Sequence, residues 1–157
     1  MPNLINWFAY DEMMNPEVIK KAGLKYEAAF SVSLSAHKLV FNKIPLDNGG
    51  KEKLGHANIA PIPDNLGMMD GILYEMLDEN LPKLDALYHH PDEYQRKKMR
   101  FTKHDFQFVD GFVYIAQNDR TKNGLMPSKE MLQAYKGCRK ILSKLYLSKL
   151  LIRPALD

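Results

Sequence analysis

The sequence has almost no cysteine, no metal-binding spacing and no long apolar run. Cys138 is the only cysteine among 157 residues, so an internal disulfide cannot form and a reducing compartment is expected. The histidines are scattered except for the neighbours His89 and His90, and this spacing is not typical of a zinc site. No apolar run approaches the ~20 residues that a membrane-spanning helix requires. We therefore expect no metal, no cofactor and no membrane partner.

The N-terminal residues "MPNLINWFAY" lack the basic segment and the apolar stretch that characterise a secretory signal, which favours a cytoplasmic location. The composition, 45% hydrophobic and 26% charged, is typical of a soluble globular protein. A chain of this length corresponds to one domain, which we predict to span residues 1–157.

Charge is distributed unevenly along the chain. Residues 1–93 contain 8 Lys/Arg and 14 Asp/Glu, a net charge of −6, whereas residues 94–157 contain 14 and 5, a net charge of +9. A basic half can bind nucleic acid. The sequence shows no helix-turn-helix, zinc-finger or aromatic-rich basic strand pattern, so we favour a solvated basic face and do not expect a nucleic-acid partner.

Strand-like patterns outnumber helical ones. Apolar or alternating runs predict strands within residues 4–10, 26–41, 56–65, 67–77, 93–102 and 104–117. Helical punctuation or spacing occurs within residues 15–23, 78–88 and 128–152, with Asn15, Asn80 and Ser128 as candidate N-caps. The sum predicts an α+β fold that is mostly β, with a short early helix, a middle helix and a long C-terminal helix.

The C-terminal helix is predicted to cover residues 129–149 and to pack on the outside of the sheet. Its apolar residues recur at steps of three and four: Met131, Tyr135, Cys138, Leu142 and Leu145. A helix that lies on a membrane surface shows a similar pattern. Packing against a barrel is the simpler interpretation, and Cys138 then serves as a small core residue.

Several short motifs occur in an order that resembles the γ-glutamylcyclotransferase-like superfamily. They are "FAY" at the end of the first strand, "GHANIAPI", "GILYEML", "LPKLDALY" followed by "YQR", and "NGLMPSKEML". Leu84, Asp85, Tyr94 and Arg96 match the family's LD-x-x-EG helix and the Tyr-x-basic motif after it, without a gap. The resemblance, over about residues 5–142, implies a small mixed β-barrel whose pocket lies between the first loop and this helix.

The sequence departs from the family pattern at both walls of that pocket. Tyr88 stands where the family has its catalytic glutamate, and His89 stands where it has glycine. Asp11 and Glu12 replace the Gly and Ser/Thr that follow the first strand in the family. A tyrosine, with an ordinary pKa of ~10, is a poor general base at neutral pH. The resemblance therefore implies the fold but leaves the activity open.

The resemblance places Tyr88 in the pocket, and helical spacing puts it on the inner face with Leu81 and Leu84. Periodicity alone is also consistent with Tyr88 as a core aromatic residue, followed by a polar turn at His89 and His90. We predict Tyr88 as the catalytic residue and a cavity between the first loop and Tyr88. The predicted ligand-binding residues are Tyr10, Asp11, Glu12, Met13, His89 and Tyr94.

Three functions remain open on sequence grounds. The first is a divergent enzyme that acts on a small amide, amine or amino-acid derivative with Tyr88 in place of the carboxylate. The second is a true γ-glutamylcyclotransferase in which Glu12 or Glu93 supplies the carboxylate. The third is an inactive domain that keeps the pocket for ligand sensing or partner contact. If Asp11 or Glu12 faces the pocket, its charge would repel a free α-carboxylate, so we expect a site that disfavours that group and tolerates neutral or cationic small molecules such as amines.

Overall fold

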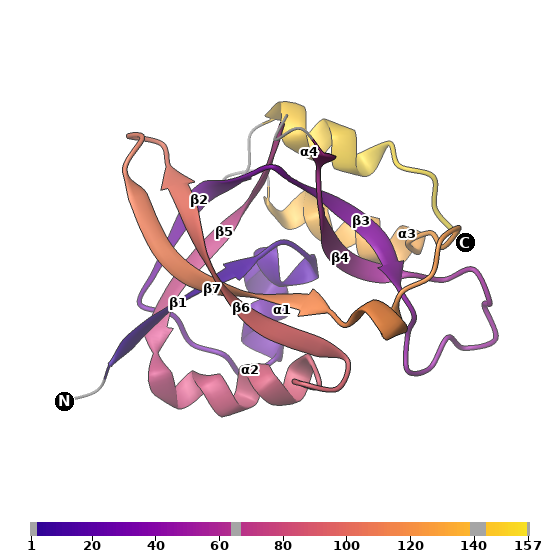
Figure 1. Ribbon diagram of the computed structural model, residues 1–157, viewed down its shortest axis with the longest axis horizontal. Coiled ribbons are helices and arrows are strands. Elements are labelled where there is room, and N and C mark those ends of the chain that lie inside the picture. The colour runs from indigo at the N-terminus through magenta and orange to yellow at the C-terminus, as the bar shows by residue number, and fades with distance from the viewer. Residues whose placement is uncertain (1–2, 64–66, 139–143, 157) are drawn as a thin grey trace.

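The computed structural model describes residues 3–63, 67–138 and 144–156, and its centre is a five-stranded closed barrel (Figure 1). The strands follow one another around the barrel as β1 (Leu4–Ala9), β5 (Met68–Leu77), β2 (Ala28–Ser35), β6 (Tyr94–Lys103) and β7 (Phe108–Ala116). β1 runs antiparallel to β5 and parallel to β7, which closes the ring and makes the barrel mixed. The predicted α+β class with a mixed β-barrel is confirmed.

The strand-like run at residues 26–41 forms two strands in different sheets. β2 ends at Ser35, and β3 (His37–Lys43) pairs with β4 (His56–Pro61) in a separate two-stranded sheet that lies beside the barrel. The intervening Ala36 has a φ of 62°, a left-handed conformation that breaks the extended chain. The sequence offers no glycine or asparagine there, so the pattern did not predict the break.

Short helices flank the barrel. α1 (Pro16–Lys21) begins after Asn15, whose side chain accepts a hydrogen bond from the Glu17 backbone N–H as predicted. α2 (Leu81–Leu87) follows a 3₁₀ turn, Asp78–Asn80, and lies below the strands in Figure 1. Asn80 occupies the N-cap position of α2, but its side chain makes no capping bond there and instead donates to the Leu77 carbonyl.

The C-terminal region is helical but is not one long helix, which corrects that part of the prediction. α3 (Lys129–Ala134) is capped by Ser128 as expected and continues as a 3₁₀ turn, Tyr135–Cys138, before α4 (Lys144–Leu151). Tyr135 and Cys138 are buried, so the apolar stripe does face the core this far. Leu142 and the Leu145 side chain lie outside what the structure describes.

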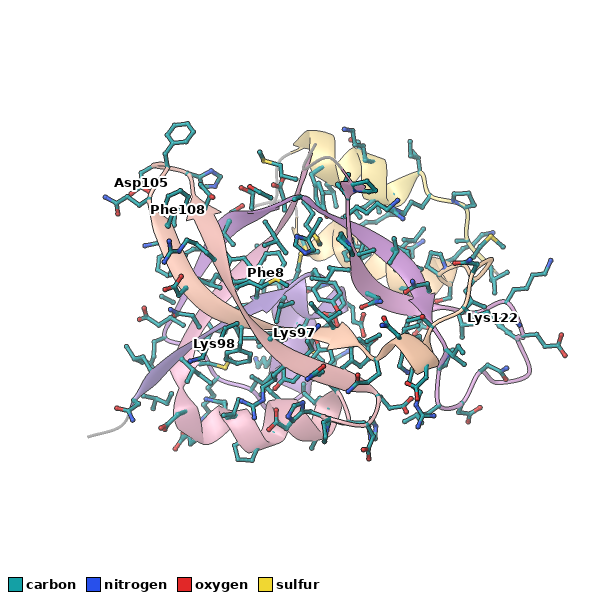
Figure 2. The ribbon with its side chains drawn as sticks, viewed as in Figure 1. Phe8, Lys97, Lys98, Asp105, Phe108 and Lys122 are labelled. Carbon is teal, nitrogen blue, oxygen red and sulfur yellow. The ribbon has the colours of Figure 1, made fainter. Side chains whose placement is uncertain are left out.

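Aromatic side chains fill the core where β1 crosses it. Trp7 stacks on Tyr74 at a ring-centroid distance of 5.5 Å, and Phe8 stacks on Phe101 at 4.6 Å. Phe8, labelled in Figure 2, lies so close to Gly71 of β5 that an added Cβ would come within 2.5 Å of its ring. Gly71 therefore lets the first strand approach its neighbour.

Among the described helices, none combines the length and the apolar character needed to cross a bilayer.

Candidate active site

The first loop begins directly after β1 and holds a buried carboxylate. Asp11 caps a 3₁₀ turn, Glu12–Met14, because its Oδ1 accepts a hydrogen bond from the Met13 backbone N–H at 3.0 Å. Its φ of −103° is ordinary extended backbone, so this loop does not need the glycine that the family pattern has there. Asp11 is only 7% exposed, which places its charge inside the protein.

The end of α2 supplies the opposite wall. Leu84 and Tyr88 are buried on the inner face of this helix, as their spacing predicted. The Tyr88 hydroxyl donates a hydrogen bond to Asp11 Oδ2 at 2.7 Å, so the phenol spans the gap between the helix and the first loop. Both oxygens of the Asp11 carboxylate therefore have a donor within the protein.

This contact puts the carboxyl group of the site on the first loop and not on the helix, and burial raises the pKa of Asp11. At the helix position where the resemblance implies a glutamate, Tyr88 carries no charge, but its hydroxyl ends on the carboxylate that the loop contributes. Burial and the nearby Asp11 raise the pKa of Tyr88 well above its ordinary value. At neutral pH Tyr88 is thus a hydrogen-bond donor and not a base.

Glu12 is the carboxyl of this loop that reaches an open space. Burial and the neighbouring Asp11 raise the pKa of Glu12 to about 8. The side chain is half-buried and lines a hollow of about 480 Å³ between the first loop, the loop after β3 and the start of α3. Asp47, Lys51 and Glu130 also line it, so acidic side chains predominate.

The other predicted site residues divide into two groups. Tyr10 and Tyr94 are buried beside the Asp11–Tyr88 contact, where their hydroxyls donate to the carbonyls of Tyr114 at 2.5 Å and Ala57 at 2.7 Å. The backbone carbonyl of Met13 accepts a hydrogen bond from Tyr74. His89 is exposed, with a φ of 49°, and the structure places it outside this group.

The first loop and Tyr88 lie opposite each other, but they touch directly, so the described residues show no open cavity between them. The Asp11–Tyr88 hydrogen bond and the packed rings of Tyr10 and Tyr94 occupy the space. The open space lies on the far side of Glu12, and a larger hollow of about 990 Å³ lies elsewhere, outside β6 and β7.

Sequence reasoning missed a residue of β7 that orders the cluster. The Tyr114 ring stacks on Tyr88 at 4.4 Å and its hydroxyl donates to Asp85 Oδ1 at 2.7 Å. Asp85 in turn lies 2.9 Å from Arg96 Nε, so two residues that match the family motifs form an ion pair. No pattern along "FVYIA" singles out Tyr114, because every residue of that run is apolar or aromatic.

Glu93, the other candidate carboxylate, forms ion pairs through both of its oxygens. Its Oε1 lies 2.9 Å from Lys43 Nζ and its Oε2 lies 3.1 Å from Arg120 Nε. Glu93 and Lys43 are both buried. Because both oxygens are paired with cations, Glu12 is the more available of the two predicted alternatives.

No metal site is evident in the part of the chain that the structure describes, where no three His, Cys, Asp or Glu side chains converge. The groups in this region that can exchange a proton include Glu12, Asp11 and the tyrosine hydroxyls around them.

Comparison with known proteins agrees with this architecture. The family model described as gamma-glutamyl cyclotransferase, AIG2-like, matches residues 8–135. A solved structure described as gamma-glutamyl cyclotransferase is 20% identical, with a TM-score of 0.80 over 99% of this chain and 90% of that one. An uncharacterised protein from Homo sapiens has the same identity and TM-score over 98% of this chain and 90% of its own.

A yeast gamma-glutamyl cyclotransferase described as specific to glutathione is 13% identical, with a TM-score of 0.69 over 94% of each chain. At these identities the likeness shows the fold alone. No curated protein matches the sequence. Because the family model covers most of the chain, this protein belongs to the gamma-glutamyl cyclotransferase, AIG2-like family.

Proposed function

We propose that this protein is a cyclotransferase-type enzyme that acts on a small amide, amine or amino-acid derivative, with Glu12 as the carboxylate that moves the proton. The observation that carries the proposal is the position of Glu12: it lines an open hollow, it adjoins the Asp11–Tyr88 contact, and its pKa is raised to about 8. A carboxylate with a pKa near the working pH is suited to general acid–base catalysis.

The reaction needs one proton relay and no cofactor. The amine nitrogen of the substrate attacks the carbonyl carbon of its own amide, and a new C–N bond forms while the old one breaks. Glu12 in its ionised form accepts the proton of the attacking amine and returns it to the leaving nitrogen. Tyr88 keeps its proton, so its proposed role is to hold Asp11 in place and not to transfer the proton.

The charge of the hollow supports a preference among substrates. Glu12, Asp47 and Glu130 line it against the single cation Lys51. A free carboxylate would enter an acidic region, whereas an amine would be attracted to it. We therefore place amino amides without a carboxylate first, then γ-glutamylamines, which carry one carboxylate, and last γ-glutamyl dipeptides and glutathione, which carry two.

The test is a search for the cyclised product by mass spectrometry after incubation with γ-glutamylamines, γ-glutamyl dipeptides and glutathione. Glu12→Gln should reduce product formation by roughly 10²–10⁴-fold, the usual contribution of a positioned acid–base group. Glu130→Gln changes the same chemical group in the same hollow and should retain most of the activity. Wild-type activity should rise with pH through about 8, as Glu12 ionises. Equal activity in Glu12→Gln and wild type would refute the proposal.

A second candidate is an inactive domain that binds a small ligand. The hydrogen bond between Tyr88 and Asp11 supports it, because this bond fills the place where the resemblance implies catalysis. Saturable binding of an amine that leaves the compound chemically unchanged, and that Glu12→Gln weakens, would favour this second function.

A further inference from the structure

The larger hollow of the molecule lies away from Glu12, on the outside of the barrel. It measures about 990 Å³ and is bounded by β6, β7, the start of β1 and both ends of α2. This volume is within the range of sites that hold a small organic ligand, about 300–1,000 Å³. Its apolar surface comes from four side chains that are only partly buried: Ile5, Leu81, Met99 and Phe112.

Cations dominate the polar part of this hollow. Arg96, Lys97, Lys98 and Arg100 line it, and Asp110 is the one carboxylate among its lining residues. Arg96, Lys98 and Arg100 alternate along β6, so they project from the same face of that strand. A concave surface lined mainly by one sign of charge concentrates the electrostatic field and attracts ions of the opposite sign.

Two of these four cationic side chains form ion pairs with carboxylates, and two do not within the described part of the chain. Arg96 Nε lies 2.9 Å from Asp85, and Arg100 Nε lies 3.0 Å from Asp110. One carboxylate cannot take all five donors of a guanidinium, so each arginine keeps donors for a ligand. Lys97 and Lys98 are exposed and, within the described part of the chain, have no carboxylate within ion-pairing distance. Figure 2 shows both lysines on the middle of β6.

The apolar part of the hollow adjoins the cations. Phe112 lies directly opposite Lys98 in the β6–β7 register, so an aromatic ring and an ammonium group share one face of the hairpin. Tyr114, two residues along β7 on the same face, packs edge-on against the Phe112 ring at a centroid distance of 5.8 Å. A phosphate that binds Lys98 would thus leave a planar group within reach of Phe112, where stacking is favourable.

We infer that this hollow is a second binding site, for a small organic phosphate with an aromatic body, the chemistry of a mononucleotide. The phosphate contacts Lys98 and Arg100, and the planar body lies against Phe112 beside Arg96, since these side chains share one face of the hairpin. This site is independent of the proposed reaction at Glu12, because none of its lining residues belongs to the hollow that Glu12 lines.

The experiment is isothermal titration of the purified protein with AMP, adenosine and inorganic phosphate at low salt. AMP should bind at least tenfold more tightly than adenosine or phosphate alone, because only AMP uses both parts of the hollow. Lys98→Glu should weaken AMP at least tenfold. Lys122→Glu is the matched control: Lys122 is also exposed but lies at the far side of the molecule in Figure 2, and its variant should bind AMP within twofold of wild type.

A second variant separates stacking from charge. Phe112→Leu keeps an apolar side chain and should weaken AMP severalfold while leaving the affinity for phosphate unchanged. Equal AMP affinity in Lys98→Glu and Lys122→Glu would overturn the inference, as would the absence of AMP binding to wild type. A single-stranded oligonucleotide that binds more tightly than AMP, with a steep salt dependence, would also overturn it in favour of an extended nucleic-acid surface.

Discussion

At the scale of single residues, the first loop and α2 each contribute one group to a buried hydrogen bond. The loop contributes a carboxylate, Asp11, and the helix contributes the phenol of Tyr88 that donates to it. Relative to the family pattern, Asp11 alone would be a buried carboxylate without this donor, and Tyr88 alone would be a buried phenol without an acceptor. Together they satisfy each other, and the open carboxyl that remains is Glu12.

We expect Tyr88→Phe to destabilise the protein by about 1–3 kcal/mol, because it leaves Asp11 Oδ2 buried without its donor. Urea unfolding at pH 7 measures this. Tyr26→Phe is the matched control, since Tyr26 is 39% exposed, and it should change the free energy of unfolding by less than about 0.5 kcal/mol. Equal effects of the two variants would contradict the contact.

The ionisation of Glu12 should oppose stability as pH rises. Burial raises the pKa of Glu12 from its ordinary 4.5 to about 8 in the folded protein, so the folded state favours the protonated form. This cost is absent below pH 4.5, grows as pH rises above it, and is complete above about pH 8. Glu12→Gln removes the charge, so its melting temperature relative to wild type should increase between pH 5 and pH 8.5, by at least roughly 2–4 °C. A difference that does not depend on pH would mean that Glu12 titrates normally.

At the scale of elements, the loop of the β6–β7 hairpin has a backbone conformation that its sequence does not predict. The Lys103 N–H bonds to the Gln107 carbonyl across a three-residue loop, and Phe106 in that loop has a φ of 65°. Glycine is the usual residue at this position of such a hairpin. Phe106 is also 85% exposed, so packing does not compensate for the backbone strain.

We expect Phe106→Gly to stabilise the protein by about 1 kcal/mol, because glycine adopts a positive φ without the steric cost of a Cβ. Phe106→Ala removes the ring but keeps the Cβ, and it should give little or no gain. Differential scanning calorimetry of the three proteins distinguishes the two effects. A gain of equal size in both variants would assign it to the exposed ring and not to the backbone.

At the scale of the whole molecule, a buried ion pair joins the two sheets. Lys43 of β3 reaches Glu93 at the start of β6, and Arg120 after β7 holds the other Glu93 oxygen. Lys43→Met leaves a buried carboxylate with one partner and should cost about 3–5 kcal/mol. Lys38→Met, on the exposed side of the same strand, should cost little in the same thermal unfolding assay. A small effect of Lys43→Met would mean that Arg120 alone suffices.

The sequence predicted the fold better than the site. Strand-like runs, the caps at Asn15 and Ser128, and the motif order indicated the barrel and its flanking helices. The break at Ala36 was missed because alanine in a left-handed conformation has no sequence signal. The resemblance placed Tyr88 opposite the first loop, but the direct hydrogen bond to Asp11 was not predicted, because it joins residues 77 positions apart and spacing patterns report only local neighbours.

The order of strands around the barrel has a consequence for a chain emerging from the ribosome. β1 is synthesised first, but its partners β5 and β7 begin at Met68 and Phe108. Such distant pairing cannot stabilise the nascent chain until late, whereas the β3–β4 and β6–β7 hairpins can form as they emerge. We therefore expect the loop that carries Asp11 and Glu12 to gain the support of both partner strands only after β7 has emerged.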